Sequence, residues 1–299
     1  MPWLSRVFFF SLKKDQKNIK RGWIPLFKAD YHIHSYFSGD SMEKPDNIIQ
    51  KARDHEFVEI AITDHLDPDY PDTDINFDLD LPAYMMALTD ITKKTEGTGL
   101  KVRKGIETGL QKHLENQLSP VLQDSFFDFV IGSIHCADGF DFAEGGFFEH
   151  HTRDEAHRIY FETLYENLKI FDGISVLGHL DFIKRYGSKT YGKDHKELDY
   201  NLHMDVIEEI LKLAIHKGTG IEVNTSGFRY GLGHPHPHQK ILSIYRELGG
   251  EIITTGSDAH TADQIGESFN TVYAMLAEMG FRYICGFDKK EPVFHRIVI

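Results

Sequence analysis

The sequence predicts a single α/β domain built from seven strand–helix units with parallel strands. Three observations predict it. Short apolar runs alternate with longer amphipathic segments seven times, most of the runs have the composition of strands buried on both faces, and no Pro/Gly/Ser-rich linker divides the chain. Seven parallel strands either close into a barrel or stay open as a doubly wound sheet, and the pattern alone permits both.

Each unit has its own local signals. Pro45 suits the first turn of a helix, Gly218 is a typical helix stop, and Pro120 is expected to interrupt its helix. The segments 282–287 and 293–299 are expected to add edge or capping strands. The expected strands are 27–33, 58–65, 100–107, 127–135, 173–179, 219–226 and 250–258. The expected helices are 45–55, 81–95, 110–123, 152–171, 202–218, one opening near Pro237, and 261–280.

Composition narrows the class of protein. The net charge of −13 argues against a nucleic-acid partner, because binding to a phosphate backbone needs clustered cations. Two cysteines imply no disulfide framework, and a cytoplasmic location is expected. The apolar run at residues 7–10 is too short to span a bilayer, so no membrane association is expected. Residues 1–27 are interpreted as an extension outside the fold, and residues 28–299 as the domain.

Polar side chains stand at the carboxyl end of every expected strand. His32 and His34 alternate along the first strand, so both imidazoles face one side. A lone histidine after a strand is more often a surface or core residue than a ligand, but seven strand ends in register favour one site. The residues concerned are His32, His34, Asp64, His65, Glu107, His135, His179, Asn224, Asp258 and His260.

These nitrogen and oxygen donors suit divalent Zn, Fe or Mn, and the pattern does not choose among them. So many donors exceed what one ion uses, which favours two or three ions that share a carboxylate, with Glu107 as the candidate bridge. Cys136 alternates with His135 and is expected in the core. The run His234–His238 is extended by its prolines and is expected to lie mostly outside the site.

The ordered motifs DYHIHSYFSGDS, AITDH, GIE, IGSIH, LGHLDFIKRYG, IEVNTSGFRYGLG and GSDAH resemble the polymerase-and-histidinol-phosphatase (PHP) family, and within it the histidinol-phosphatase branch. The resemblance runs from about residue 28 to the C-terminus. It implies a single-domain, distorted seven-stranded (β/α)7 barrel with a trinuclear metal centre. Asp40 stands where many members of the family have histidine, which predicts a harder third site. The implied ligand sets are His32, His34, Glu107 and Asp258; Glu107, His135 and His179; and Asp40, His65 and His260.

The resemblance implies a metal-dependent phosphomonoester hydrolase that converts L-histidinol phosphate to L-histidinol and phosphate in histidine biosynthesis, by attack of a metal-bound hydroxide on phosphorus. Arg185 and Arg229 are expected to bind the phosphate, and Glu149 the cationic end of this small substrate. Asp258, His260 and a bound water are candidates for protonating the leaving alkoxide, and the sequence does not choose among them.

The alternatives are another PHP phosphoesterase, namely a nucleotide phosphatase, an exonuclease or a phosphotyrosine phosphatase, and a metal-binding module without activity. Against the last, every ligand position holds a competent side chain. The sequence leaves the oligomeric state open.

Overall fold

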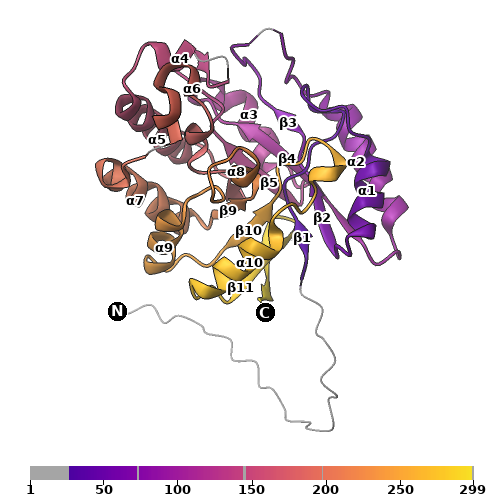
Figure 1. The fold of residues 1–299 in the computed structure, drawn as a ribbon. Helices are drawn as coiled ribbons and strands as arrows, with labels where there is room; N and C mark the ends of the chain where they lie inside the picture. Colours follow the sequence, from indigo (N-terminus) through magenta and orange to yellow (C-terminus); the bar gives the residue numbers. More distant parts are fainter. Residues whose placement is uncertain (1–26, 73, 144–145, 197, 298–299) are drawn as a thin grey trace, which may run out of the picture.

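The computed structural model describes residues 27–72, 74–143, 146–196 and 198–297. Seven parallel strands form a nearly closed barrel surrounded by helices (Figure 1), in the order β1, β2, β4, β5, β8, β9, β10. A further short strand, β3, pairs with β4 beyond the end of β2. The strands are β1 (Ala29–Asp30), β2 (Glu59–Ile62), β3 (His65–Leu66), β4 (Lys101–Gly109), β5 (Phe129–Ser133), β8 (Val176–Leu177), β9 (Gly220–Asn224) and β10 (Ile253–Gly256).

A few polar contacts close the barrel between its first and last strands. The Tyr31 N–H donates to the Thr255 carbonyl at 2.9 Å, and the Thr255 hydroxyl donates to the Ala29 carbonyl at 2.9 Å. Farther along, Ile33 and Ala259 form one parallel bridge. The closed alternative is therefore the observed one, and the residues that follow β1 and β10 lie side by side at the carboxyl end of the barrel.

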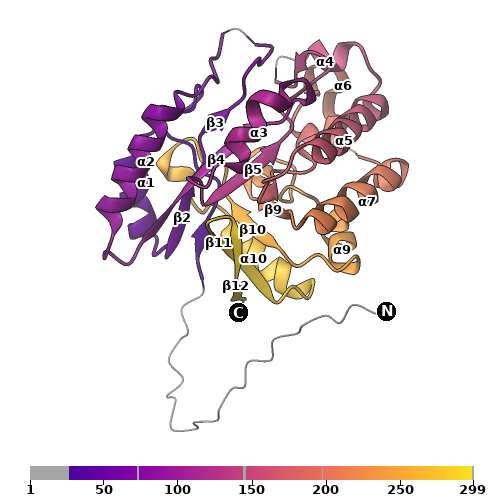
Figure 2. The same ribbon diagram turned by 180° about the vertical axis from the view of Figure 1, so that it is seen from behind.

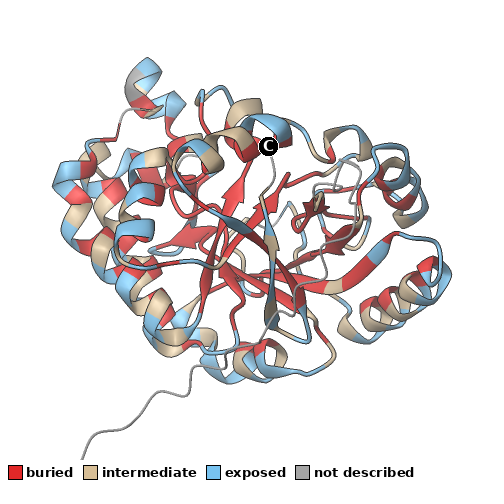
Figure 3. Cartoon of the chain, turned by 90° about the horizontal axis from the view of Figure 1, so that it is seen from below, coloured by how far each residue is buried: buried red, intermediate tan, exposed pale blue. Residues whose placement is uncertain are grey.

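Helices cover the outside of the strands, and Figure 3 shows buried strands within a ring of helices whose outer faces are exposed. The expected interruption at Pro120 is wrong, because Pro120 lies inside α3. Proline removes one helical hydrogen bond to the carbonyl of Asn116, and Asn116 is exposed, so water can satisfy that carbonyl. The helices are α1 (Pro45–Asp54), α2 (Leu81–Thr95), α3 (Glu115–Gln123), α4 (Gly146–Glu149), α5 (Arg153–Ile170), α6 (Ser188–Tyr191), α7 (Tyr200–Lys217), α8 (Ser226–Arg229), α9 (Gln239–Glu247) and α10 (Phe269–Glu278).

Two antiparallel hairpins complete the described fold. The first is β6 (Cys136–Ala137) with β7 (Phe140–Asp141), and the second is β11 (Tyr283–Asp288) with β12 (Glu291–Arg296). The second lies at the amino end of the barrel strands, near the C-terminus in Figure 2. None of the helices in these described parts is both long and apolar enough to cross a membrane.

The β11–β12 hairpin closes the floor of the barrel, as the capping alternative predicts. Cys285 and Phe287 are buried and join an apolar cluster inside the strands. The Phe287 ring lies 5.0 Å from the Phe129 ring. The backbone N–H of Phe287 donates to the Tyr31 hydroxyl oxygen at 2.6 Å. Because apolar side chains fill the amino end of the barrel, we expect a site for chemistry at the opposite, carboxyl end. The other members of the cluster are Ala29, Ala61, Ile131 and Val176.

We predict that Phe287→Ala lowers the free energy of unfolding by about 3–5 kcal/mol, because a buried aromatic ring is replaced by a cavity. Urea unfolding followed by circular dichroism measures this change. Phe294→Ala on β12, where the residue is 45% exposed, is the matched control and should cost less than about 0.5 kcal/mol. Equal losses in the two variants would show that the hairpin does not seal the barrel.

Candidate metal centre

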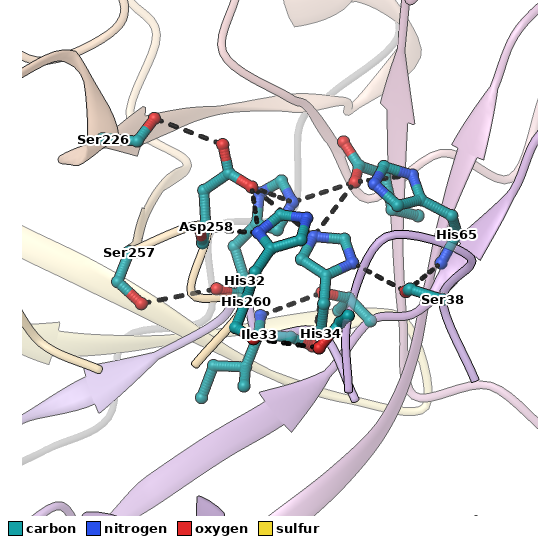
Figure 4. Close-up of polar contacts among 12 residues, drawn as sticks. His32, Ile33, His34, Ser38, His65, Ser226, Ser257, Asp258 and His260 are labelled. Atoms are coloured by element: carbon teal, nitrogen blue, oxygen red, sulfur yellow. Dashed lines mark hydrogen bonds and ion pairs between the residues drawn. The ribbon is translucent and has the colours of Figure 1, made fainter. Parts of the chain in front are cut away.

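The polar residues at the strand ends converge in one cluster at the carboxyl end of the barrel (Figure 4). Within it, four sets of three side chains each have ligand atoms within 4.8 Å of one another. Parallel strands that close into a barrel bring their carboxyl ends to one face, which explains why residues more than two hundred positions apart meet here. The sets are His34, His65 and His260; His32, Glu107 and His179; His32, His34 and Asp258; and His65, Glu107 and His135.

Glu107 lies at the centre of the cluster, fully buried on β4. Its Oε2 is 2.9 Å from His32 Nε2 and 3.4 Å from His34 Nε2. Its Oε1 is 3.1 Å from His179 Nε2 and 3.3 Å from His135 Nε2. Each carboxylate oxygen therefore faces a different group of imidazoles, which is the arrangement that a bridging carboxylate needs.

A third group of donors lies beside the first two. Asp40 Oδ2 is 3.0 Å from His260 Nε2 and 3.9 Å from His65 Nε2. The His34 ring stacks between the other two imidazoles, with centroids 4.2 Å from His260 and 4.3 Å from His65. The structure thus brings together all nine residues that the sequence predicts as ligands.

The hydrogen bonds of His34 test whether a cation fits. The Ser38 hydroxyl donates to Asp64 Oδ1 at 2.8 Å, so the 3.0 Å contact with His34 must use the proton on His34 Nδ1. His34 Nε2 then holds a lone pair, and it is buried without a hydrogen-bond partner. Its nearest polar neighbours are carboxylate oxygens of Glu107 and, at 3.5 Å, Asp258. Three acceptors that face one another at this spacing suit a bound cation.

The charges of the cluster are tightly coupled. Burial alone would raise the pKa of Glu107, but the imidazoles of His32, His65 and His135 hold it well below its usual range. Burial would lower the pKa of His135, yet Asp67 and Glu107 raise it to about 10. In the same way Glu107 and Asp40 raise the pKa of His65 to about 9 against its burial. Metal-free protein therefore holds protonated imidazoles at positions where a metal needs neutral ones.

Two carboxylates that the sequence analysis missed hold the imidazoles from behind. Glu222 Oε1 is 2.7 Å from His32 Nδ1, and Asp67 Oδ1 is 2.6 Å from His135 Nδ1. A carboxylate on the far nitrogen fixes the tautomer and direction of a ligating imidazole. The alternation of side chains along a strand could have identified both carboxylates. Glu222 and Asn224 share a face of β9, and Asp67 follows His65 by two residues.

The cluster forms the floor of a cavity of about 300 Å³. Arg185 enters it from the segment after β8, with Nη2 2.7 Å from Asp258 Oδ2, and its side chain is only 5% exposed. Its guanidinium carbon lies 4.5 Å from the centre of the Phe182 ring and 4.0 Å from that of Tyr230. The cavity is lined by Asp40, His65, Tyr70, Phe77, His135, Phe142, Ala143, His179, Phe182, Arg185, Tyr186, Tyr230, Asp258 and His260.

The structure does not bring the other two expected substrate contacts, Arg229 and Glu149, to this cavity. Arg229 donates to the carbonyls of Ser257 and Asp258 at 2.9 and 2.8 Å and pairs with Glu267 at 2.9 Å. It thereby braces the turn at Asp258, whose φ of 54° is unusual for a residue other than glycine. Glu149 ends α4 on the exposed side, because its neighbours Phe147 and Phe148 occupy the buried side.

Comparisons with known proteins agree with this geometry. Residues 30–226 match the PHP domain family. The chain is 29% identical to a histidinol-phosphatase of Lactococcus lactis, over 87% of this chain and 94% of that protein. It is 31% identical to a probable histidinol-phosphatase of Clostridium acetobutylicum, over 87% of this chain and 97% of that protein. The crystal structure of the L. lactis histidinol phosphate phosphatase, complexed with zinc, L-histidinol and phosphate, aligns with a TM-score of 0.81 at 28% identity, covering 90% of this chain and 100% of that one.

We predict that Asp67→Asn weakens metal binding by about 10- to 100-fold, because His135 and His65 lose the carboxylate on their Nδ1 atoms. Competition with a fluorescent chelator measures the affinity. Asp69→Asn, at an exposed position on the same loop, should leave it unchanged. Wild-type affinity in Asp67→Asn would show that Asp67 does not support the ligands.

We also predict that metal uptake at pH 7 releases protons, because the raised pKa values of about 9 for His65 and about 10 for His135 keep both rings protonated in the metal-free protein. Calorimetric titrations with zinc in buffers of different ionisation enthalpy count these protons. Since the competing protons are lost at higher pH, the apparent affinity should rise from pH 6 to pH 8. Uptake without proton release would contradict this electrostatic account.

Proposed function

The chain belongs to the PHP domain family, and we propose that it is a histidinol-phosphatase, which hydrolyses L-histidinol phosphate to L-histidinol and phosphate with two or three divalent metal ions. The observation that carries this proposal is a buried guanidinium, Arg185, at the edge of a cluster of nine metal-type donors, six of which line the same cavity as Arg185. The relatives named above carry this activity in their names, and the crystallised L. lactis protein shares the fold.

The donors of the cluster suit Zn²⁺, Fe²⁺ or Mn²⁺, and the crystallised relative holds zinc. Glu107 would bridge two ions, with His32, His34 and Asp258 on one side and His135 and His179 on the other. Asp40, His65 and His260 would hold the third. When bound, such ions supply Lewis acidity toward phosphoryl oxygens and lower the pKa of water, which provides the nucleophile without a serine or cysteine.

Arg185 binds the phosphoryl group in this proposal. Its guanidinium is held from one side by Asp258 Oδ2 and by the Ser226 hydroxyl, and two aromatic rings flank it. Because these contacts already fix the Arg185 side chain, it loses little conformational entropy when the substrate binds. A planar guanidinium matches two phosphate oxygens and stabilises the charge that spreads over them in the transition state.

The two side chains that the sequence analysis offers for protonating the leaving alkoxide are both engaged elsewhere. Burial would raise the pKa of Asp258, but Arg185 and His32 hold it well below its usual range, so this carboxylate has no proton to give. His260 would hold the third ion, and its Nε2 lies 3.0 Å from Asp40 Oδ2 while its Nδ1 lies 3.1 Å from the Asp258 carbonyl oxygen. We therefore assign the proton that the histidinol oxygen receives to a water molecule.

The outer walls of the cavity suit the organic part of the substrate. Tyr70, Phe77, Phe142, Tyr186 and Tyr230 line it, and flat aromatic side chains favour a small planar imidazole. We propose that the imidazolylmethyl group of histidinol phosphate lies among these rings while its phosphate reaches the metals and Arg185. The cytoplasm is the compartment we propose, because both cysteines are buried free thiols.

We predict that the zinc- or manganese-loaded protein releases phosphate from L-histidinol phosphate at least about 100-fold more efficiently than from nucleoside monophosphates, phosphotyrosine or oligonucleotides. A phosphate-release assay on chelated protein, with each metal added back, measures the ratio. Preference for any of the other substrates would support a different PHP phosphoesterase, and no turnover with any metal would support a module without activity.

Arg185→Ala should raise KM and lower kcat/KM for histidinol phosphate by about 100-fold, because one charged partner of the phosphoryl oxygens is lost. Metal content, measured by mass spectrometry, should stay at the wild-type level. The control is Arg246→Ala on α9, outside the residues that line the cavity, which should keep wild-type kinetics. Wild-type kinetics in Arg185→Ala would refute the assignment of the phosphate-binding arginine.

A further inference from the structure

One polar residue at a strand end, Asn224, is not among the predicted metal ligands. It is the last residue of β9 and is fully buried. Its backbone is held independently of its side chain, because its N–H donates to the His236 carbonyl at 2.7 Å and its carbonyl accepts the His236 N–H at 2.8 Å. Its side-chain amide contacts Ser226 on one side and Glu222 on the other.

These contacts fix which way the Asn224 amide faces. Its Oδ1 accepts the Ser226 N–H at 2.9 Å, and its Nδ2 donates to Glu222 Oε2 at 3.1 Å. The reversed amide would set one N–H group against another and would place two oxygens without a proton side by side. Asparagine thus offers an acceptor to one neighbour and a donor to the other, which an ionised aspartate cannot do.

The amide orientation also fixes the proton of the Ser226 hydroxyl. The hydroxyl oxygen is 2.5 Å from Asn224 Oδ1 and 3.2 Å from Asp258 Oδ2, and the second contact is drawn in Figure 4. Asn224 Oδ1 carries no hydrogen, so the short contact requires the single hydroxyl proton of Ser226. The Ser226 oxygen is then an acceptor, and Arg185 Nη2 donates to it at 2.5 Å. Asp258 Oδ2 is likewise left to Arg185 Nη2, at 2.7 Å.

Glu222 connects the other end of the Asn224 amide to the metal centre. Its Oε2 accepts from Asn224 and also from the backbone N–H of His179, at 2.8 Å. Its Oε1 is 2.7 Å from Nδ1 of the predicted ligand His32. All of these side chains are buried, so water does not compete for their hydrogen bonds. The continuous chain of contacts is Arg185, Ser226, Asn224, Glu222 and His32.

We propose that Asn224 is a positioning residue that links the phosphate-binding Arg185 to the metal centre. Its Oδ1 holds the proton of Ser226, so that the Ser226 oxygen accepts from Arg185. Without Asn224 the hydroxyl would turn to Asp258 Oδ2 and compete with Arg185 for that oxygen. Asn224 is not among the residues that line the cavity, so its effect on a bound phosphate is indirect. The inference rests on the proposed function, since it assigns Arg185 to the phosphate.

Binding of inorganic phosphate to the zinc-loaded protein tests this link. We expect Asn224→Ala to raise the dissociation constant of phosphate about tenfold, because Arg185 loses part of its support. In the Arg185→Ala background the same substitution should change the constant by less than about twofold, since the arginine through which it acts is gone. Calorimetry measures the affinities of wild type, the two single variants and the double variant. Mass spectrometry should show wild-type zinc content in each.

Ser226→Ala interrupts the same chain one step closer to Arg185. It should also weaken phosphate binding about tenfold, and adding Asn224→Ala to it should cause less than about twofold further loss. Thr225→Val is the matched control, because Thr225 stands between these two residues and its buried hydroxyl has no hydrogen-bond partner among the described residues. This variant should keep wild-type phosphate affinity.

Three results would overturn the inference: phosphate affinity within about twofold of wild type in Asn224→Ala, an equal loss from Asn224→Ala with and without Arg185, or a further loss of about tenfold when Asn224→Ala is added to Ser226→Ala. If Asn224→Ala does not fold, Asn224→Val, which favours a strand, takes its place with the same expected results. Failure of the proposed function has a different signature. The wild-type protein would then not hydrolyse histidinol phosphate, although Asn224 and Arg185 would still be coupled in phosphate affinity.

Discussion

The interaction on which the rest of the structure depends is the burial of one carboxylate, Glu107, among imidazoles from four other strand ends. A buried carboxylate is stable only with partners that neutralise it. Here His32, His65 and His135 do so, with ring nitrogens 2.9 to 3.3 Å from its oxygens, and His179 Nε2 lies 3.1 Å from Oε1. Because each oxygen faces different rings, divalent ions can replace the protons of these imidazoles without rebuilding the site. The electrostatics of the metal-free cluster and its capacity for metal have the same origin.

The barrel makes this burial possible. The β11–β12 hairpin fills the amino end of the barrel with Cys285 and Phe287. The apolar packing of that end therefore does not depend on the polar residues at the carboxyl end. At the other end, carboxylates behind the rings, Glu222 and Asp67, set which nitrogen of each imidazole faces inward. The same logic recurs one layer farther out, where Asp181 sets the tautomer of His236. Fixed tautomers at several depths keep the imidazole donors of the cluster in one geometry.

The sequence predicts much of this arrangement, for a physical reason. Ligand-type residues that end buried strands are visible as polar breaks in apolar runs, and eight of the nine predicted ligands stand at such ends. The ninth, Asp40, lies in the loop after the first strand, and its role was expected only from the family resemblance. Barrel closure was left open by the pattern, since it rests on a few contacts such as that between Tyr31 and Thr255. Arg229 and Glu149 are the last residues of the short helices α8 and α4. The direction of their side chains depends on packing, here on Glu267 and on Phe147 and Phe148, and no periodicity encodes that. Residues 1–26 lie outside the described residues. The interpretation of residues 1–27 as an extension outside the fold therefore stays a prediction.

Anomalous X-ray diffraction at the zinc edge, on crystals of zinc-loaded protein, tests the central claim most directly. The account predicts two strong peaks, each within coordination distance of a different oxygen of Glu107, and a third beside Asp40, His65 and His260. It would be contradicted by a single peak, or by two peaks of which neither touches Glu107. In that case the buried carboxylate would only be a charge partner of the imidazoles.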